Sequence, residues 1–307
     1  MLTIRDLEPA DVADVVDAVN RDQRIAHRRN RFVDGTLDRR ELSEALLSRR
    51  ARTWIGRDGG RLAGHLTATI LPSATTGSSA WISPDAVSFD RPTTLASLYA
   101  RAGAQWIADG VFEHVAWVYD RPDVREPWLD MNFAVVFRRG SLSLDTPRSA
   151  RLRSGYECRR GSYADLDLAM ELTAIIDESD ADGPSFAADA PLERADLAET
   201  LADPDTTYTI VEHYGEPIAQ CIAFPLLPVR GAYPHTLHLS AVAVRPEHRG
   251  RGVATAMLNE ILSDARRHGY DYADVTWRTA NIATAAFWTA YGLTPTYVRL
   301  RRLVDRR

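Results

Sequence analysis

The stretch that decides the fold runs from Leu237 to Ala254 and reads LHLSAVAVRPEHRGRGVA. Its first part, Leu237–Val244, alternates, is rich in β-forming residues and predicts a strand. Pro246 marks the end of that strand, because proline cannot continue a ladder of hydrogen bonds. After the glycines, the apolar residues of 253–262 recur at helical spacing. The turn Arg249–Gly252 therefore lies between a strand and a helix.

This junction has the features of an anion-binding turn. Free N–H groups at a helix start, together with the helix dipole, favour a negative charge. Gly250 and Gly252 let the main chain close on a phosphate, and Arg249 and Arg251 can add charge-assisted bonds. A pyrophosphate is the expected guest, and a plain connecting turn is the alternative. A Walker loop is excluded because the chain contains no lysine, and the three glycines and following acid of a dinucleotide fingerprint are absent.

Two blocks of sequence resemble the GNAT superfamily of N-acetyltransferases. Val242–Ala254 is similar to its acyl-CoA signature, Arg/Gln-x-x-Gly-x-Gly/Ala, through Arg249, Gly252 and Ala254. Asn281–Leu293 is similar to a second block that ends in Phe-Tyr-x-x-x-Gly-Phe, with Trp288 and Leu293 as departures. The resemblance covers residues 156–307, and it reaches residues 1–140 only through an internal repeat.

The resemblance implies a mixed sheet in which the strand ending at Val244 splays from the strand ending near Trp277. The pantetheine arm of acetyl-CoA, the expected cosubstrate, lies in that gap in the family. Asn281 is expected near the cofactor or its binding helix, and no metal is expected. The residues expected to bind the cofactor are Val242, Ala243, Val244, Arg249, Gly250, Arg251, Gly252, Val253, Ala254, Thr255 and Asn281.

Two side chains are candidates for the chemistry of acetyl transfer. The resemblance implies Tyr291 as the general acid that protonates the departing thiolate, and a tyrosine has a suitable ordinary pKa. His238 stands where many relatives carry a glutamate base, although a structural hydrogen bond is the alternative role. Strict alternation places His238 on one face with Ser240 and Val242. Asp274 and Glu212 are weaker candidates for the base, and an amide at or near Val244 is expected to polarise the thioester carbonyl.

The chain also repeats itself. Five pairs of segments recur in the same order at offsets of roughly 155 to 160 residues, as in Thr53–Gly64 and Thr207–Ala219, which both read as β-hairpins. We therefore expect two copies of a β-α-(α)-β-β-β-α-β-α-β unit. The fold class is α/β (α+β), with two tandem GNAT folds, each a mixed, mainly antiparallel sheet flanked by helices. This layout is similar to that of the mycothiol synthases, although no motif singles out that reaction.

The two copies are expected to differ in function. Residues 1–142 form a degenerate, non-catalytic domain, 143–155 a linker, and 156–307 the catalytic N-acetyltransferase domain. The first copy has no glycine in Asp90–Leu98, where the phosphate turn should lie, and Met131 stands in place of Tyr291. Five tryptophans in this copy are read mainly as core residues: Trp54, Trp81, Trp106, Trp117 and Trp128.

The expected acceptor is the primary amine of a small molecule. The acids in Ile176–Gly183 could attract it, although a solvated loop is the blander interpretation. A protein or peptide N-acetyltransferase and a non-catalytic acyl-CoA sensor remain as alternatives.

The net charge of −5 argues against nucleic acid as a partner, and no apolar run predicts a membrane span. Two cysteines, Cys158 and Cys221, are too few for a disulfide framework or thiolate metal site, which favours a cytoplasmic protein. A monomer or a homodimer is expected.

Overall fold

The computed structural model describes every residue except 146–151, 182–183, 185–192, 227–232, 234 and 306–307. The described residues form two compact units. The first comprises residues 1–138 together with residues from 295 onward, and the second comprises residues from 139 to 294. Asp182 of the acidic stretch, and residues 146–151 of the expected linker, therefore lie outside the described residues.

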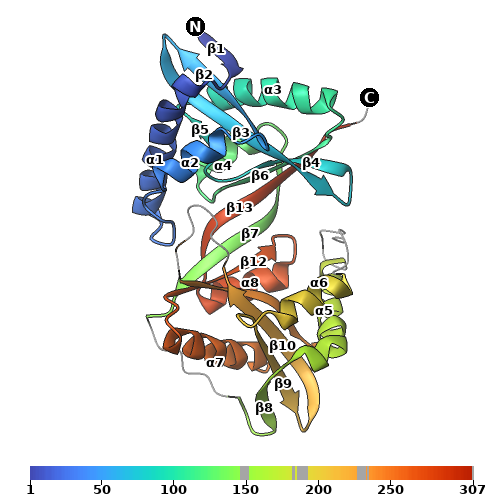
Figure 1. Ribbon diagram of the computed structural model, residues 1–307. Coiled ribbons are helices and arrows are strands. Elements are labelled where there is room, and N and C mark those ends of the chain that lie inside the picture. Colours follow the sequence, from blue (N-terminus) through green and yellow to red (C-terminus); the bar gives the residue numbers. More distant parts are fainter. Residues whose placement is uncertain (146–151, 182–183, 185–192, 227–232, 234, 306–307) are drawn as a thin grey trace. The chain divides into compact units, whose positions relative to one another are not determined.

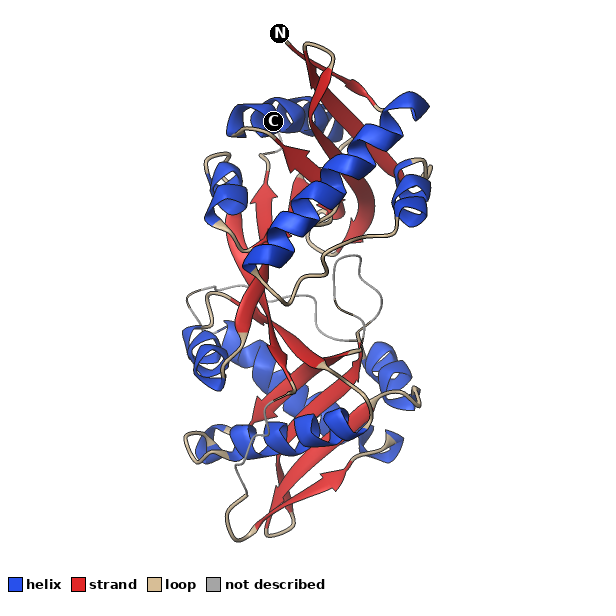
Figure 2. Cartoon of the chain, turned by 90° about the vertical axis from the view of Figure 1, so that its left-hand side faces the viewer, coloured by secondary structure: helices blue, strands red, loops and turns tan. Residues whose placement is uncertain are grey.

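The first unit has one mixed sheet with helices on both of its faces (Figures 1 and 2). Its strand order is β1-β2-β3-β4-β6-β13-β7, and β5 pairs with β3. Among the paired strands from β1 to β6, β4 and β6 run parallel and the other pairs are antiparallel. Its elements are β1 (Leu2–Asp6), α1 (Val12–Arg29), α2 (Arg39–Leu46), β2 (Ala51–Asp58), β3 (Arg61–Ser73), β4 (Gly77–Ile82), β5 (Val87–Phe89), α3 (Pro92–Ala108), β6 (Glu113–Tyr119), α4 (Pro122–Leu129) and the start of β7 (Ala134–Ser143).

The second unit repeats that order, which confirms the expected repeat and fold class. Its sheet runs β7-β12-β11-β10-β9-β8, antiparallel from β8 to β11 and parallel between β11 and β12. Its elements are the end of β7, β8 (Tyr156–Arg160), α5 (Leu166–Ala181), α6 (Arg194–Ala202), β9 (Thr207–His213), β10 (Glu216–Pro225), β11 (Thr236–Val244), α7 (Val253–Arg267), β12 (Tyr272–Arg278) and α8 (Ile282–Tyr291).

Two strands depart from the domain ranges expected from the repeat. Strand β13 (Thr294–Leu303) follows α8 in the chain, yet it pairs antiparallel with β6 of the first unit, from Tyr297↔Tyr119 to Leu303↔Glu113. Strand β7 begins in the first unit, and from Arg139 it belongs to the second, where it lies beside β12. A repeat in the sequence assigns each strand to its own copy, so it carries no signal of this exchange.

The sheet of the second unit packs against a separate apolar cluster on each face. Helix α7 buries one face of residues, Met257, Leu258 and Ile261 among them, against Leu237 and Leu239 of β11. Each such side chain contributes roughly 1.5–3 kcal/mol when fully buried. The opposite face is covered by α5 and α6 and forms a second cluster with Tyr208, Ile210 and Ile222. Strand β11 thus lies between two helical layers.

Candidate active site

The two parallel strands of the second unit separate partway along their length. Strands β11 and β12 pair from Thr236↔Tyr272 to Leu239↔Val275. Both strands continue, β11 to Val244 and β12 to Arg278. In the described part of the chain, β11 has β10 and β12 as its only neighbours, so backbone groups beyond Leu239 on the β12 side have no strand partner. This gap is the splay that the resemblance implied.

A β-bulge in β11 re-aims the residues that border the gap. The register with β10 shifts between Gln220 and Ile222, and Ala241 adopts a left-handed backbone conformation with φ 46°. An extra residue in one strand reverses the faces of the residues that follow it. Val242 therefore packs with the α7 cluster, on the same face as Leu237 and Leu239. The expectation that Val242 shares a face with His238 was wrong, because strict alternation ends at the bulge.

The glycine-rich turn has the backbone of an anion nest. Gly250 and Gly252 both have left-handed conformations, with φ 71° and 79°. Nothing lies within 4 Å of the place where a Cβ would stand on either glycine. Gly252 is the N-cap of α7, and no side chain caps that helix. The first-turn N–H groups thus point to an open, exposed turn that can accept a phosphate.

The arginines near this nest differ in their hydrogen bonds. Arg249 Nε donates to Val244 O at 3.1 Å, which folds its side chain back onto the end of β11. Arg245 donates to Pro217 O at 2.9 Å and to Glu171 at 2.6 Å, so it holds β11 to its neighbours. Arg251 is exposed at the turn. Positive charge is therefore concentrated around the nest.

His238 belongs to a buried charged group beside the point where the strands part. Its Nδ1 lies 2.7 Å from Asp274 Oδ1, its register partner on β12. The other oxygen of Asp274 accepts from Arg139 Nε of β7. The Asp274 side chain is 2% exposed, whereas that of His238 is 19% exposed. The ring of Phe224 on β10 packs 5.2 Å from the imidazole, centroid to centroid.

A comparison with protein families decides what this arrangement belongs to. The model of the Acetyltransferase (GNAT) family matches residues 172–293, from within α5 to the end of α8, and so includes the splay, the bulge, the nest and His238. Residues 172–293 are a GNAT domain. Membership in this family implies acyl transfer from an acyl-CoA. No protein with a curated description matches the chain.

Solved structures show the same fold over both units. The chain is similar to a GCN5-related N-acetyltransferase from Sphaerobacter thermophilus, with 17% identity, a TM-score of 0.67, and coverage of 99% of this chain and 96% of that one. It is also similar to a tandem GNAT protein from the clavulanic acid biosynthesis pathway, with 15% identity, a TM-score of 0.57 and complete coverage of both chains. At these identities the likeness shows the fold alone, which is a tandem GNAT fold.

Tyr291 of the GNAT domain lies in the core between α7 and α8. Its side chain is 7% exposed, and its hydroxyl donates to Asn259 Oδ1 of α7 at 2.8 Å. Trp288, not Tyr291, occupies the tyrosine position of the Phe-Tyr-x-x-x-Gly-Phe pattern, and Trp288 is buried as well. The geometry favours a structural role for Tyr291 over that of a proton donor.

Asn281 connects α8 to α5. Its side chain caps α8 by accepting from Thr284 N at 3.1 Å, and its Nδ2 donates to Asp180 Oδ1 at 2.8 Å. Arg278, at the end of β12, donates to the second oxygen of Asp180 at 3.2 Å. These contacts are to α8 and α5, whereas the resemblance placed Asn281 near the cofactor or its binding helix.

The other sequence candidates have structural partners. The acidic stretch at 176–181 is the last part of α5, not a loop, and Asp180 within it is neutralised by Arg278. Glu212 pairs with Arg159 at 2.5 Å, away from His238 in the sheet order.

Cys221 is fully buried in the α7 cluster, as expected. Across the described residues, no helix is long and apolar enough to span a membrane, and no His, Cys, Asp or Glu cluster is placed to hold a metal ion.

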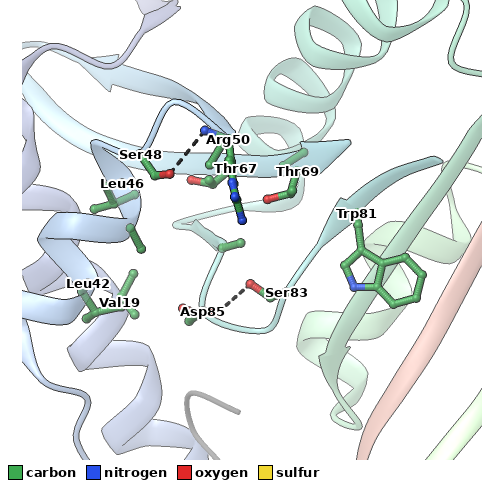
Figure 3. A pocket seen from close by; sticks show the side chains of 14 residues that line it. Val19, Leu42, Leu46, Ser48, Arg50, Thr67, Thr69, Trp81, Ser83 and Asp85 are labelled. Atoms are coloured by element: carbon green, nitrogen blue, oxygen red, sulfur yellow. Dashed lines mark hydrogen bonds between the residues drawn. The ribbon is translucent and has the colours of Figure 1, made fainter. Parts of the chain in front are cut away.

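The first unit lacks the nest. Asp90 and Arg91 connect β5 directly to α3, which begins at Pro92, and no left-handed glycine lies between them. This unit holds a cavity of about 180 Å³ on the α1–α2 side of β3, shown in Figure 3. None of its lining side chains is a histidine, cysteine or tyrosine, and its one lining carboxylate, Asp85, accepts from Ser83 at 2.6 Å.

Proposed function

We propose that the second unit transfers the acetyl group of acetyl-CoA to the primary amine of a small molecule. One observation carries this proposal. Strand β11 leaves β12 after Leu239↔Val275, one residue beyond His238, and then leads through the bulge to the nest of Gly250 and Gly252. An imidazole, a place for an extended arm and a place for a pyrophosphate thus follow one another along β11 and the turn after it.

The cofactor is held mainly by the main chain. The free backbone edge of Val242–Val244 pairs with the amides of the pantetheine arm, as an added strand would. The N–H groups from Gly250 to Thr255 receive the pyrophosphate at the N-terminus of α7. Arg249 and Arg251 supply charge at the exposed turn. The first unit, which has no such nest, is proposed to be catalytically silent.

The chemistry needs a base for an amine that is protonated in water. His238 takes a proton from the ammonium group, and the neutral nitrogen attacks the thioester carbonyl, which a free N–H of the bulged strand polarises. The C–N bond forms as the C–S bond breaks. The attacking nitrogen loses its second proton and the departing thiolate takes up a proton; the ordinary pKa of a cysteine thiol is about 8.5. The products are the amide and the free thiol of CoA.

The test is release of CoA thiol from acetyl-CoA in the presence of a panel of small primary amines and of short peptides. We expect at least one small amine to release thiol in proportion to the amide formed. His238→Gln lowers kcat by about 10²–10⁴-fold, the usual worth of a general base. His268→Gln, at the exposed end of α7, is the matched control and leaves the rate unchanged. Thiol release with peptides alone, or binding without any turnover, overturns the proposal.

A further inference from the structure

We propose that Asp274 and Arg139 are positioning residues that fix the proton of His238 on Nδ1 and leave Nε2 as the base. This inference rests on the proposed function of the second unit. It is built on one chain of contacts, from Arg139 Nε to Asp274 Oδ2, and from Asp274 Oδ1 to His238 Nδ1. None of these side-chain contacts involves the residues of the expected cofactor site.

The geometry decides which ring nitrogen carries the proton. A carboxylate can only accept, so the 2.7 Å contact with Asp274 requires a proton on His238 Nδ1. In the neutral ring, Nε2 then carries the lone pair. Because His238 and Asp274 are partners in a parallel register, the backbone holds the two side chains together. Phe224 packs against the ring and restrains its rotation.

Arg139 keeps Asp274 in its accepting state. The Asp274 side chain is 2% exposed, and a carboxylate so deeply buried is stable only when it is paired. The guanidinium of Arg139 is 13% exposed and provides that pairing from the neighbouring strand. Arg139 therefore holds in place the carboxylate that accepts from His238 Nδ1.

Arg139 comes from the first half of the chain. It lies on β7, which belongs to the first repeat by sequence, whereas His238 and Asp274 belong to the second. The proposed base in the GNAT domain therefore depends on a residue more than thirty positions upstream of the residues that match the family. This dependence gives the first repeat a role in catalysis that needs no cofactor of its own.

The decisive variant is Asp274→Asn in the full chain. Because Arg139 donates to one side of this group, the amide oxygen will turn toward Arg139 and the NH₂ group toward His238. An NH₂ group donates to Nδ1, so the ring must carry its proton on Nε2. The analogous substitution in serine proteases enforces the wrong tautomer and lowers kcat by about 10⁴-fold. We expect kcat to fall by about 10²–10⁴-fold, with KM for acetyl-CoA unchanged.

The tautomer itself is the readout that needs no turnover. Long-range ¹H–¹⁵N spectra at pH 8 distinguish Nδ1–H from Nε2–H imidazoles, and the spectrum of His238→Gln identifies the signals of His238. The wild type should show Nδ1–H, and Asp274→Asn should show Nε2–H. An unchanged tautomer in Asp274→Asn overturns the inference, as does a loss of stability with unchanged kcat. If the tautomers behave as expected and no amine releases thiol, the proposed function fails while the positioning role stands.

The role of Arg139 is tested with a variant that leaves no buried charge unpaired. Arg139→Met alone leaves Asp274 unpaired and is expected to destabilise the fold, whereas Arg139→Met/Asp274→Asn removes both charges and should fold. In the double variant, His238 should lose its single tautomer and kcat should fall as in Asp274→Asn. Arg138→Met is the matched control, because the adjacent Arg138 pairs with the buried Asp120 at 2.7 Å, and Asp120 keeps Arg125 as a second partner. A tautomer or kcat change in the control equal to that of the double variant overturns the role of Arg139.

Discussion

The hydroxyl of Tyr291 donates a 2.8 Å hydrogen bond to Asn259 Oδ1, and both side chains are buried between α8 and α7. The bond joins the helix whose N-terminus forms the nest to the helix that follows β12. A buried acceptor that loses its donor costs about 1–3 kcal/mol. This contact therefore has a value in stability that is separate from any value in catalysis.

Tyr291→Phe is expected to lower the free energy of unfolding by about 1–3 kcal/mol and to leave kcat near that of the wild type. Urea unfolding and thiol release measure the two effects on the same preparation. Tyr214→Phe serves as the control, since Tyr214 is 81% exposed and its change should affect neither. A hundredfold loss of kcat with unchanged stability would return the role of general acid to Tyr291.

The bulge at Ala241 predicts an unusual order of substitutions. Ala241 has φ 46°, a conformation that costs an L-residue roughly 1–2 kcal/mol and costs glycine little. Ala241→Gly should thus be tolerated, although glycine normally weakens a strand. Ala241→Val should destabilise by about 1–3 kcal/mol, because a β-branched residue fits this region poorly. The melting temperatures of the two variants test the bulge, and the reverse order would show that β11 is regular there.

Two buried histidines make the first unit sensitive to acid. Burial lowers the pKa of His65 and of His114 to about 4, against an ordinary value of about 6.5. Between these values the unfolded chain binds two more protons than the folded one, so stability falls as the pH falls. The slope of the free energy of unfolding against pH approaches about 2.7 kcal/mol per pH unit near pH 5. Urea unfolding at several pH values, followed by tryptophan fluorescence, measures it.

The control for this prediction is His65→Gln, which removes one of the two groups and should halve the slope. Stability that does not change between pH 6.5 and pH 5 would mean that the buried imidazoles accept protons in the folded state.

The fold was largely predictable because its signals are local. The alternation of Leu237–Val244, the proline that ends it and the helical spacing after Gly252 each depend on neighbouring residues, and the structure has the strand, turn and helix there. The repeat extended this pattern to the first half of the chain. The exchange of β7 and β13 was not predictable, because it depends on which of two similar sheets a strand completes.

The site was predictable in its backbone and less so in its side chains. The nest follows from the strand, the glycines and the helix, whereas the splay was implied by the resemblance to the GNAT superfamily. The bulge reverses the face of Val242 without any glycine or proline to announce it. Arg139 lies 135 residues from Asp274, and nothing local links the two. Asn259 could be suspected only weakly, because it is a polar residue among the apolar residues on the buried face of α7.

Of the two repeats, the second is expected to hold acetyl-CoA and the first is not. Calorimetric titration of the full chain with acetyl-CoA measures the number of sites. We predict one site per chain, with affinity at least about tenfold weaker in Gly252→Ala, a loss of about 1.4 kcal/mol. Gly269→Ala is the control, since Gly269 is also left-handed and open but follows the far end of α7. Arg91→Ala, at the corresponding turn of the first unit, should not affect binding. Two sites per chain, or one that is lost in Arg91→Ala and kept in Gly252→Ala, would show that the second repeat is not the one that holds acetyl-CoA.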